Sequence, residues 1–380
     1  MLLGGCIRGR KLTWGPSDDT SVAILHKRLP KVCPPGHSSS IHSKCALLFH
    51  EKITANNGAH GGVHPIVSLE SHQENLANLV AKALHALPQS GRPNALGPKY
   101  LAEHFYLPET KDGTKVKPDF ISVTRGPGMR SSLTTGLDTA KGIAVAWQIP
   151  LVAVNHMQAH ALTPRLVSAL SGLSSIVDNK PTYKPDFPFL SLLVSGGHTL
   201  LVHSQSITSH PILATTTDIA MGDAIDKIAR LVLPPSRLQE GGEIMFGRLL
   251  ERFAFPNGES DHDYTPPTAR AQEIARKETQ WGWALVPPLA ETRSGSKSRA
   301  MEFTFSGLGS AIKRLCETKA DMSDEERLEL AREAMRLAFE HLASRVGWAL
   351  KDLKDKGEGV KTLVVSGGVA SNRFLRTVYV

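Results

Sequence analysis

Two histidines one helical turn apart are the residues of this sequence best suited to chemistry. His156 and His160 belong to the segment His-Met-Gln-Ala-His, directly after an apolar run at 151–155. Side chains at positions i and i+4 share one face of a helix, so both imidazoles can bind one metal ion at about 2.0–2.1 Å. The zinc-protease pattern His-Glu-x-x-His is excluded, because Met157 stands where its general base would be. The chain has 16 histidines, so a chance pair with a structural role stays open.

A repeated glycine turn is the second feature that could do chemistry. Residues 189–199 (FLSLLVSGGHT) and 361–371 (KTLVVSGGVAS) each contain an apolar run that ends in Val-Ser-Gly-Gly. Glycine lets the chain turn tightly and bring its N–H groups close to a phosphate. One such turn is weak evidence. Two of them at strand ends favour a nucleotide site, because nucleotides bind at the carboxyl ends of strands in open α/β sheets.

The segments around these motifs alternate between strand and helix patterns. Short apolar runs predict strands at 20–25, 46–53, 120–124, 151–155, 189–194, 199–203 and 362–365. Amphipathic periodicity predicts helices at 70–87, 131–148, 156–167, 219–233, 242–253, 307–318 and 323–356. This alternation indicates an α/β fold, and we expect its strands to pair in parallel.

Length and local composition indicate two domains. A polar, Ser- and Pro-containing stretch predicts a crossover linker at 168–186, between a first α/β lobe at 18–167 and a second at 187–380. Residues 1–17 carry basic but no acidic residues and form a basic leader, either a presequence remnant or a random one. We expect the segments 29–43 and 258–298 to be surface excursions.

Composition narrows the class of partner. The chain has 44 Lys and Arg against 36 Asp and Glu, and the resulting charge of +8 favours polyanionic partners. Its four cysteines include no C-x-x-C pair, which argues against a disulfide scaffold or a thiolate zinc site and suits a reducing compartment. The most apolar stretch, 142–154, is interrupted by Gln148 and Pro150 and is shorter than the ~20 residues that span a bilayer. We expect no membrane segment.

Six segments of the chain, in this order, resemble the tRNA N6-adenosine threonylcarbamoyltransferase family. They are RGPGMRSSLTTGLDTAKGIA (125–144), NHMQAHAL (155–162), LLVSGGHT (192–199), DIAMGDAIDKIAR (218–230), FTFSGLGSAI (303–312) and VVSGGVASNRFLR (364–376). The resemblance covers about residues 17–380, with 29–43 and 258–298 poorly matched. Segment 218–230 and the net charge are more similar to the mitochondrial-type branch.

The resemblance implies a two-lobed actin/Hsp70/sugar-kinase-like fold with the active site in the cleft between the lobes. It implies transfer of a threonylcarbamoyl group from threonylcarbamoyl-AMP to N6 of adenosine 37 in tRNAs that read ANN codons. By the same resemblance His156 and His160 are the metal ligands, and Asp18, Asp19 and His198 are catalytic. The positions that match the family's adenylate-binding residues are Val194, Ser195, Gly196, Gly197, His198, Asp226, Gly242 and Asn372.

Two of these residues also have plainer roles open to them. Asp226 could be a helix-surface carboxylate paired with Lys227 or Arg230. Asn372 could be the N-cap of the last helix, a role compatible with ligand binding.

The resemblance also implies cofactors and partners. It implies one divalent metal ion, with zinc and iron foremost and manganese compatible with two imidazoles. Threonylcarbamoyl-AMP comes from a separate synthase, and basic residues such as Arg125 and Arg130 neutralise phosphates of the tRNA. We expect a homodimer in the mitochondrial matrix, with the cytoplasm as the alternative location.

The sequence departs from the family at both ends. The family's third metal ligand is an Asp downstream of the second glycine turn, and residues 373–380 contain no acidic residue, His or Cys. Near the other end, Pro16 cannot donate to a ladder, so we expect half of a core strand to be lost. We therefore expect a chain truncated at both ends, with an incomplete second lobe. Two other functions stay open, a non-catalytic tRNA- or partner-binding paralogue and an ATP-dependent phosphotransferase of the same fold.

Overall fold

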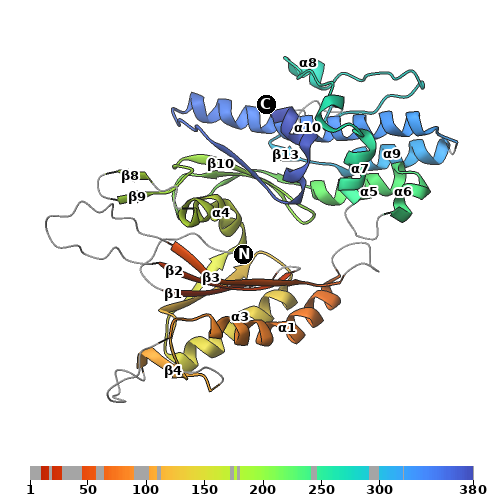
Figure 1. Cartoon of the computed structure of the whole chain (residues 1–380). Helices are drawn as coiled ribbons and strands as arrows, with labels where there is room; N and C mark the ends of the chain where they lie inside the picture. Colours follow the sequence, from red (N-terminus) through yellow and green to blue (C-terminus); the bar gives the residue numbers. More distant parts are fainter. Residues whose placement is uncertain are drawn as a thin grey trace. The chain divides into compact units, whose positions relative to one another are not determined.

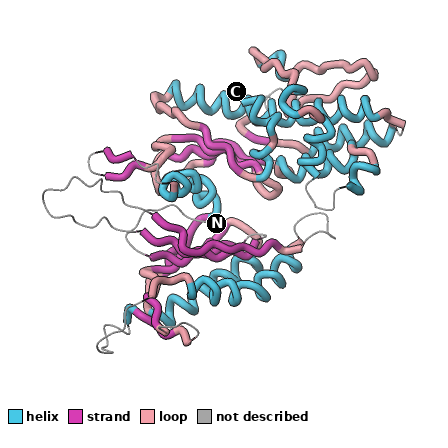
Figure 2. The backbone as a smooth tube through the Cα atoms, viewed as in Figure 1, coloured by secondary structure: helices cyan, strands magenta, loops and turns pink. Residues whose placement is uncertain are grey.

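The chain forms two compact units, Met1–Asp186 and Phe187–Val380, in a computed structural model (Figure 1). The division falls at the end of the stretch that the sequence assigns to a crossover linker. Each unit is built around its own five-stranded sheet (Figure 2). The structure describes residues 10–16, 19–27, 45–56, 64–89, 102–108, 113–171, 175–177, 180–240, 246–290, 299–319 and 321–379. The predicted excursion at 29–43 lies outside these residues.

The sheet of the first unit has the strand order β3-β2-β1-β6-β7. Its strands are β1 (Arg10–Pro16), β2 (Asp19–Lys27), β3 (Cys45–Thr54), β6 (Phe120–Gly126) and β7 (Leu151–Asn155). β1, β2 and β3 pair antiparallel, whereas β1, β6 and β7 pair in parallel. Two short hairpins complete the strands of this unit, β4 (His104–Tyr106) with β5 (Thr114–Val116) and β8 (Ser175–Val177) with β9 (Lys180–Thr182).

Helices cover both faces of the first sheet. α1 (Pro65–His85) and α3 (Arg130–Trp147) lie together on one face, and α4 (His156–Leu170) lies on the other (Figure 1). The apolar stripe of α1 that the sequence predicts is buried against the strands. The core consists of Val22, Ile24, Leu76, Leu79, Val80, Ala83, Leu87, Ile121, Val123, Ala140 and Ala144.

Residues 10–16, which the sequence places in a leader, instead form β1 in the centre of this sheet. All seven pair with β2, and Lys11 to Trp14 also pair with β6. Pro16 faces Thr20 at the end of the antiparallel ladder, beyond the last residue paired with β6. A proline is tolerated at that position because no parallel-ladder donor is needed there. The expected loss of half a core strand is therefore wrong.

The second unit shares with the first a run of three antiparallel strands and a strand that pairs in parallel with the first of them. Its sheet has the order β13-β12-β11-β10-β14, with antiparallel pairing from β10 to β12 and parallel pairing of β10 with β14 and of β12 with β13. The predicted parallel pairing holds for β1 with β6, β6 with β7, β10 with β14 and β12 with β13, but the strands from β1 to β3 and from β10 to β12 pair antiparallel. β1 with β2 and β10 with β11 are joined by short loops, which suit antiparallel pairing. The strands are β10 (Phe189–Val194), β11 (Thr199–Ser204), β12 (Ile212–Thr216), β13 (Glu302–Phe303) and β14 (Leu363–Ser366).

This repeated mixed sheet, with three antiparallel strands in a row and a parallel strand beside the first, is the arrangement of the actin/Hsp70/sugar-kinase fold class. The predicted fold class is confirmed. Among the helices that the structure describes, none combines the length and the apolar character that crossing a membrane requires.

Helices of the second unit pack on one another above its sheet (Figure 1). The longest, α10, begins at an N-cap, where Ser323 Oγ accepts a hydrogen bond from the N–H of Glu326 at 3.2 Å. Three acidic residues follow in its first turn, where the helix dipole favours negative charge. The helices are α5 (Met221–Val232), α6 (Pro235–Glu240), α7 (Phe246–Ala254), α8 (Arg270–Glu273), α9 (Ser306–Thr318), α10 (Asp324–Asp355) and α11 (Arg373–Tyr379), with 3-10 turns η2 (Gly258–Asp261) and η3 (Gly368–Ser371).

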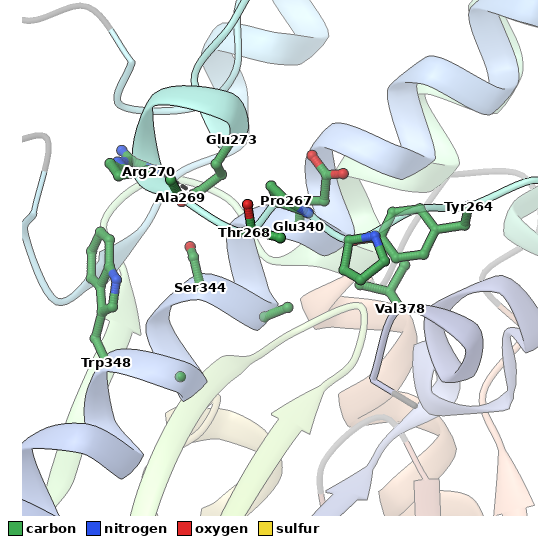
Figure 3. A pocket seen from close by; sticks show the side chains of 13 residues that line it. Tyr264, Pro267, Thr268, Ala269, Arg270, Glu273, Glu340, Ser344, Trp348 and Val378 are labelled. Carbon is green, nitrogen blue, oxygen red and sulfur yellow. Dashed lines mark ion pairs between the residues drawn. The ribbon is translucent and has the colours of Figure 1, made fainter.

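The described part of the predicted excursion, residues 258–290, is anchored to α10 by a buried charged cluster. Glu273 on α8 pairs with Arg270 and lies 3.3 Å from Arg345, which is fully buried. Both guanidinium groups lie over the ring of Trp348, at 5.2 Å and 4.7 Å from its centroid. Figure 3 shows Arg270 and Trp348 at the same end of a pocket between this segment and α10. This segment is thus an integral part of the second unit.

One carboxylate ties the end of the second sheet to α9. Asp218 accepts hydrogen bonds from the N–H groups of Ile219, Phe305 and Ser306, at 2.6 to 3.1 Å, and from the hydroxyls of Thr304 and Ser306. Burial acts to raise the pKa of Asp218, but the hydrogen bonds from Ser306 and Thr304 outweigh it and lower the pKa to about 2. The contacts therefore favour the ionised form.

We expect the stability contributed by Asp218 to depend on pH in the acid range. Its pKa lies at about 2 in the folded chain and near the usual 3.8 in the unfolded chain. The contribution is therefore complete above about pH 4 and is lost as the pH falls toward 2. Thermal melts of Asp218→Asn should show a lower Tm than the wild type at neutral pH and a difference that shrinks below pH 4. A difference of the same size at pH 2 would contradict the assignment.

Candidate functional site

The two histidines of the first unit lie at the start of α4. Asn155, the last residue of β7, is also the N-cap of the helix, and its side-chain oxygen accepts hydrogen bonds from the N–H groups of Met157 and Gln158 at 2.9 and 3.1 Å. This cap makes His156 the first residue of the helix. His160 follows one turn later, and the two rings lie 4.7 Å apart in an edge-to-face arrangement. The strand end and the cap therefore position both imidazoles.

The geometry of this pair fits a shared metal ion. The two Nε2 atoms lie 3.2 Å apart, and His156 is only 7% exposed. Two nitrogen ligands at about 2.0–2.1 Å from one ion lie about this far from each other in tetrahedral geometry. Among the described residues, no group of three or more His, Cys, Asp or Glu side chains could hold a metal. Within the part of the chain that the structure describes, the ligand set is this histidine pair.

Of the two aspartates predicted to be catalytic, the structure describes Asp19. Asp18 lies outside the described residues. Asp19 begins β2 and contacts β3, where its Oδ2 accepts a hydrogen bond from Lys52 Nζ at 2.9 Å and its Oδ1 accepts one from Thr54. Both carboxylate oxygens therefore link two strands of the sheet.

The first Ser-Gly-Gly turn closes the hairpin between β10 and β11. Val194 faces Thr199 across the antiparallel ladder, and residues 195–198 form the loop between them. The N–H of Ser195 donates to the carbonyl of His198 at 2.8 Å, and the N–H of His198 donates to Ser195 Oγ at 3.0 Å. A Cβ at Gly196 or Gly197 would meet nothing within 4 Å. The middle of the turn is therefore open to a ligand.

The second Ser-Gly-Gly turn lies beside the first, because both follow the carboxyl ends of β10 and β14, which are neighbouring parallel strands. Gly367 has a φ of +107°, and a Cβ there would lie 2.1 Å from the carbonyl oxygen of Val194. The start of α5 approaches the first turn equally closely. A Cβ at Gly222 would lie 2.6 Å from the backbone nitrogen of Gly196. Only glycines allow these three backbone segments to meet.

A cavity of about 190 Å³ lies where these segments meet. We call it the glycine-turn cavity. Gly196 of the first turn and Gly368 of the second turn both line it. The predicted residues Asp226 and Asn372 line it as well, and the full lining comes from five separate stretches of the chain. Its lining consists of Gly196, Gly222, Ile225, Asp226, Gly247, Arg248, Glu251, Phe339, Gly368, Val369, Ser371 and Asn372.

Asp226 faces this cavity from α5 with one oxygen fixed. Its Oδ1 accepts a hydrogen bond from the N–H of Gly247 at 2.9 Å. Burial raises the pKa of Asp226, against the effect of the Gly247 hydrogen bond and of the charge of Arg230. Of the two alternative partners, Lys227 pairs with Asp223 instead, at 2.8 Å from its Nζ, whereas the charge of Arg230 does act on Asp226. Burial has the largest effect on the pKa of this carboxylate.

Asn372 is the N-cap of α11, as the plainer reading of the sequence predicts. Its Oδ1 accepts a hydrogen bond from the N–H of Leu375 at 3.0 Å, and its Nδ2 lies 3.8 Å from the sulfur of Met335. The residue is 7% exposed and lines the glycine-turn cavity. The capping role and a place in the cavity wall occur together.

The remaining predicted residues have simpler positions. The side chain of Val194 is fully buried in the core, and Gly242 lies outside the described residues. Sequence reasoning missed Gly222, Gly247 and Phe339 as parts of the cavity. Gly222 carries a signal, since glycine in the first turn of a helix costs stability and often marks a close backbone approach. Phe339 is one of many apolar residues on α10, so nothing in the sequence distinguishes it as part of the cavity.

Comparisons with known proteins agree with the resemblance seen in the sequence. The family model for tRNA N6-adenosine threonylcarbamoyltransferase matches residues 110–379. The mitochondrial tRNA N6-adenosine threonylcarbamoyltransferase of Schizosaccharomyces pombe is 33% identical, over 94% of this chain and 69% of its own length. The chain belongs to this family.

A bacterial member of the tRNA N6-adenosine threonylcarbamoyltransferase family is also similar to this chain. The protein from Brucella anthropi is 30% identical over 85% of the chain and 70% of its own length. Among solved structures, component A of the (R)-2-hydroxyglutaryl-CoA dehydratase of Acidaminococcus fermentans is 11% identical, over 98% of this chain and 87% of that one, with a TM-score of 0.38. This likeness is too weak to support a conclusion about function.

The range that the family model matches includes the histidine pair and both Ser-Gly-Gly turns. The same range, residues 110–379, contains the helix that carries Asp226. The β1 strand lies before this range, and the sequence similarity to the S. pombe protein extends over most of the chain. Membership of the threonylcarbamoyltransferase family therefore rests on both units.

Proposed function

We propose that this protein transfers a threonylcarbamoyl group from threonylcarbamoyl-AMP to N6 of adenosine 37 in tRNAs that read ANN codons. Family membership supports the reaction class. The observation in the structure that carries the proposal is the glycine-turn cavity, in which both Ser-Gly-Gly turns, Asp226 and Asn372 line one space. A nucleotide site at the carboxyl ends of β10 and β14 is where open α/β sheets bind such ligands.

Different residues of the second unit contact the phosphate, the ribose and the base of the adenylate. The open N–H groups of the glycine turns face the phosphate, since turn N–H groups form concavities that bind anions. The free oxygen of Asp226 accepts hydrogen bonds from ribose hydroxyls, while Gly247 holds the other oxygen. The side chains of Phe339 and Val369 provide an apolar wall for the base. These are the contacts that an AMP leaving group requires.

The reaction itself replaces one bond by another. N6 of adenosine attacks the carbonyl carbon of the threonylcarbamoyl group, a new C–N bond forms, and the bond from that carbon to the phosphate oxygen of AMP breaks. AMP departs with the bonding electron pair, and N6 loses one proton. His156 and His160 would hold a divalent metal, zinc or iron, which would supply Lewis acidity to the acyl carbonyl when bound. Asp18, Asp19 and His198 are the proposed catalytic residues on the protein side.

Partners and location follow from the same proposal. The tRNA is the acceptor, and threonylcarbamoyl-AMP is supplied by a separate synthase, because the reaction consumes an already activated acyl group. The S. pombe relative is named as a mitochondrial protein. We propose that this chain acts in the mitochondrial matrix as a homodimer. The net charge of +8 is consistent with an acidic nucleic acid as substrate.

A transfer assay tests the function directly. The purified chain, loaded with zinc or iron, is incubated with threonylcarbamoyl-AMP and an unmodified tRNA transcript that reads an ANN codon. We expect threonylcarbamoyladenosine in the digested tRNA by mass spectrometry, with one AMP released for each modification. A transcript with guanosine at position 37 is the control and should stay unmodified. In a parallel incubation with ATP, release of ADP without threonylcarbamoyl transfer would instead indicate a phosphotransferase.

The variant Asp226→Asn tests the ribose contact. Asparagine keeps an oxygen that can accept from the N–H of Gly247, so we expect the Tm to change by less than about 2 °C. Loss of the charged acceptor should weaken AMP binding about tenfold, which corresponds to about 1.4 kcal/mol. Isothermal titration calorimetry measures the affinity of each variant for AMP. The matched control is Asp223→Asn on the same helix, whose carboxylate pairs with Lys227. Equal AMP affinities for the two variants would contradict the proposed contact.

A further inference from the structure

A second, larger cavity of the second unit has a different chemical character. Its volume is about 680 Å³, and its lining includes Arg248 and Arg252 of α7 and Arg373 of α11. We call it the arginine cavity. It shares Arg248, Glu251 and Ser371 with the glycine-turn cavity, so the two are neighbours along one wall. Nothing in the proposed transfer reaction so far uses the arginines.

Three local features bring the guanidinium groups together. Arg248 and Arg252 are four residues apart on α7 and therefore share one face of that helix. Arg373 is the first residue of α11, and its N–H donates to Glu251 Oε1 at 2.6 Å. Opposite it, Gly258 adopts a φ of +73°, and a Cβ there would lie 3.6 Å from a terminal guanidinium nitrogen of Arg373. The chain thus turns closely around this side chain.

The residues that line this cavity carry more positive than negative groups. In the part of the chain that the structure describes, none of the three guanidinium groups forms an ion pair. Glu251 is the one carboxylate among the lining residues, so the lining has three positive groups against one negative group. Arg336 of the same unit, by contrast, is paired with Glu333 and Glu340. Unpaired arginines around an open space attract anions, and guanidinium groups bind phosphates in a bidentate manner.

The aromatic rings of the arginine cavity are already occupied by one another. Phe255 is 5% exposed and meets the ring of His262 at 4.6 Å, and His262 also contacts Phe374 at 5.2 Å. His262 Nδ1 lies 2.7 Å from the hydroxyl of Thr377. The nearly buried ring of Phe255 therefore offers a base little surface on which to stack. The lining therefore suits the charged backbone of a nucleic acid better than its bases.

We propose that the arginine cavity binds backbone phosphates of the tRNA and so holds the acceptor beside the glycine-turn cavity. This assignment rests on the proposed function, because that function supplies the polyanion. Three cations around a cavity of this volume can meet more than one phosphodiester of a chain, whereas a mononucleotide offers its phosphates at one point only. Contacts of this kind position the nucleic acid and are independent of its sequence.

Charge-neutralising variants test the proposal in the full chain. Arg252→Gln and Arg373→Gln are chosen because Arg252 and Arg373 line only the arginine cavity, whereas Arg248 also lines the glycine-turn cavity. Binding of tRNA is measured by fluorescence anisotropy at several KCl concentrations, without the acyl donor. Each variant should weaken binding about 3- to 10-fold and lower the slope of log K against log salt by about one. Arg314→Gln on α9, an exposed arginine in the same unit, is the matched control and should bind like the wild type.

The outcomes separate this proposal from the proposed function. If the Arg252→Gln/Arg373→Gln double variant keeps the tRNA affinity and the salt slope of the wild type, the arginine cavity does not bind tRNA. If the double variant loses affinity for AMP and keeps it for tRNA, the cavity serves a free nucleotide and the proposal is wrong. A wild-type chain that binds no tRNA also overturns it. Loss of tRNA affinity in the variants, together with no transfer by the wild type, would support this surface and contradict the proposed function.

Discussion

His156→Ala is expected to lose its metal ion and at least about 100-fold of its threonylcarbamoyl transfer activity. The two Nε2 atoms lie 3.2 Å apart, so one imidazole removed leaves a single ligand from the described residues. Even loss of a group that only supports a ligand costs 10- to 100-fold in metal affinity or activity, and loss of a ligand should cost at least as much. Metal content by mass spectrometry of the purified protein gives a readout that does not depend on turnover.

The matched control for this prediction is His85→Ala. His85 is an exposed histidine in the last turn of α1, in the same unit and outside the pair. It should keep the metal content and activity of the wild type. Because His156 is buried, the Tm of each variant is measured in the metal-free state, so that a folding defect can be recognised. A His156→Ala chain that folds normally and still contains one metal per chain would refute the histidine site.

The histidine pair could be predicted from the sequence because every feature that positions it is local. The period of a helix places His156 and His160 on one face, and Asn155 is a residue type that favours the N-cap. The structure adds the distance between the nitrogens, which no spacing rule supplies. The adjacency of the two Ser-Gly-Gly turns needed one further step, since it depends on β10 and β14 being neighbours in a parallel pair.

What the sequence could not predict depends on contacts between distant residues. The hydrogen bond from Gly247 to Asp226 joins residues 21 positions apart, and the sequence pointed instead to Lys227, the nearest charge along the chain. β1 was assigned to a leader because its basic composition conceals its pairing with β2 and β6. β12 was missed because it is short and only one of its five residues is buried. In each case tertiary pairing outweighs the local pattern.

Gly367→Ala is expected to destabilise the second unit by about 3 kcal/mol and to abolish measurable AMP binding. A side chain at this position would adopt a φ of +107° and would place its Cβ 2.1 Å from the carbonyl oxygen of Val194. A strained backbone and an overpacked contact each cost about 1–3 kcal/mol, and the clash is with backbone that cannot turn away. Calorimetry should show the transition of the second unit lowered by roughly 6–12 °C.

The neighbouring substitution Gly368→Ala distinguishes an effect on AMP binding from an effect on the stability of the fold. A Cβ at Gly368 would meet nothing within 4 Å, yet the residue lines the glycine-turn cavity. We expect an unchanged melting transition and a several-fold loss of AMP affinity, because the added methyl group narrows the cavity without disturbing β10 or β14. If both variants melted alike, the close approach of Gly367 to Val194 would not be what holds the two turns together. Because the turns form the cavity only while that approach is intact, a stable Gly367→Ala chain with full AMP affinity would place the nucleotide elsewhere.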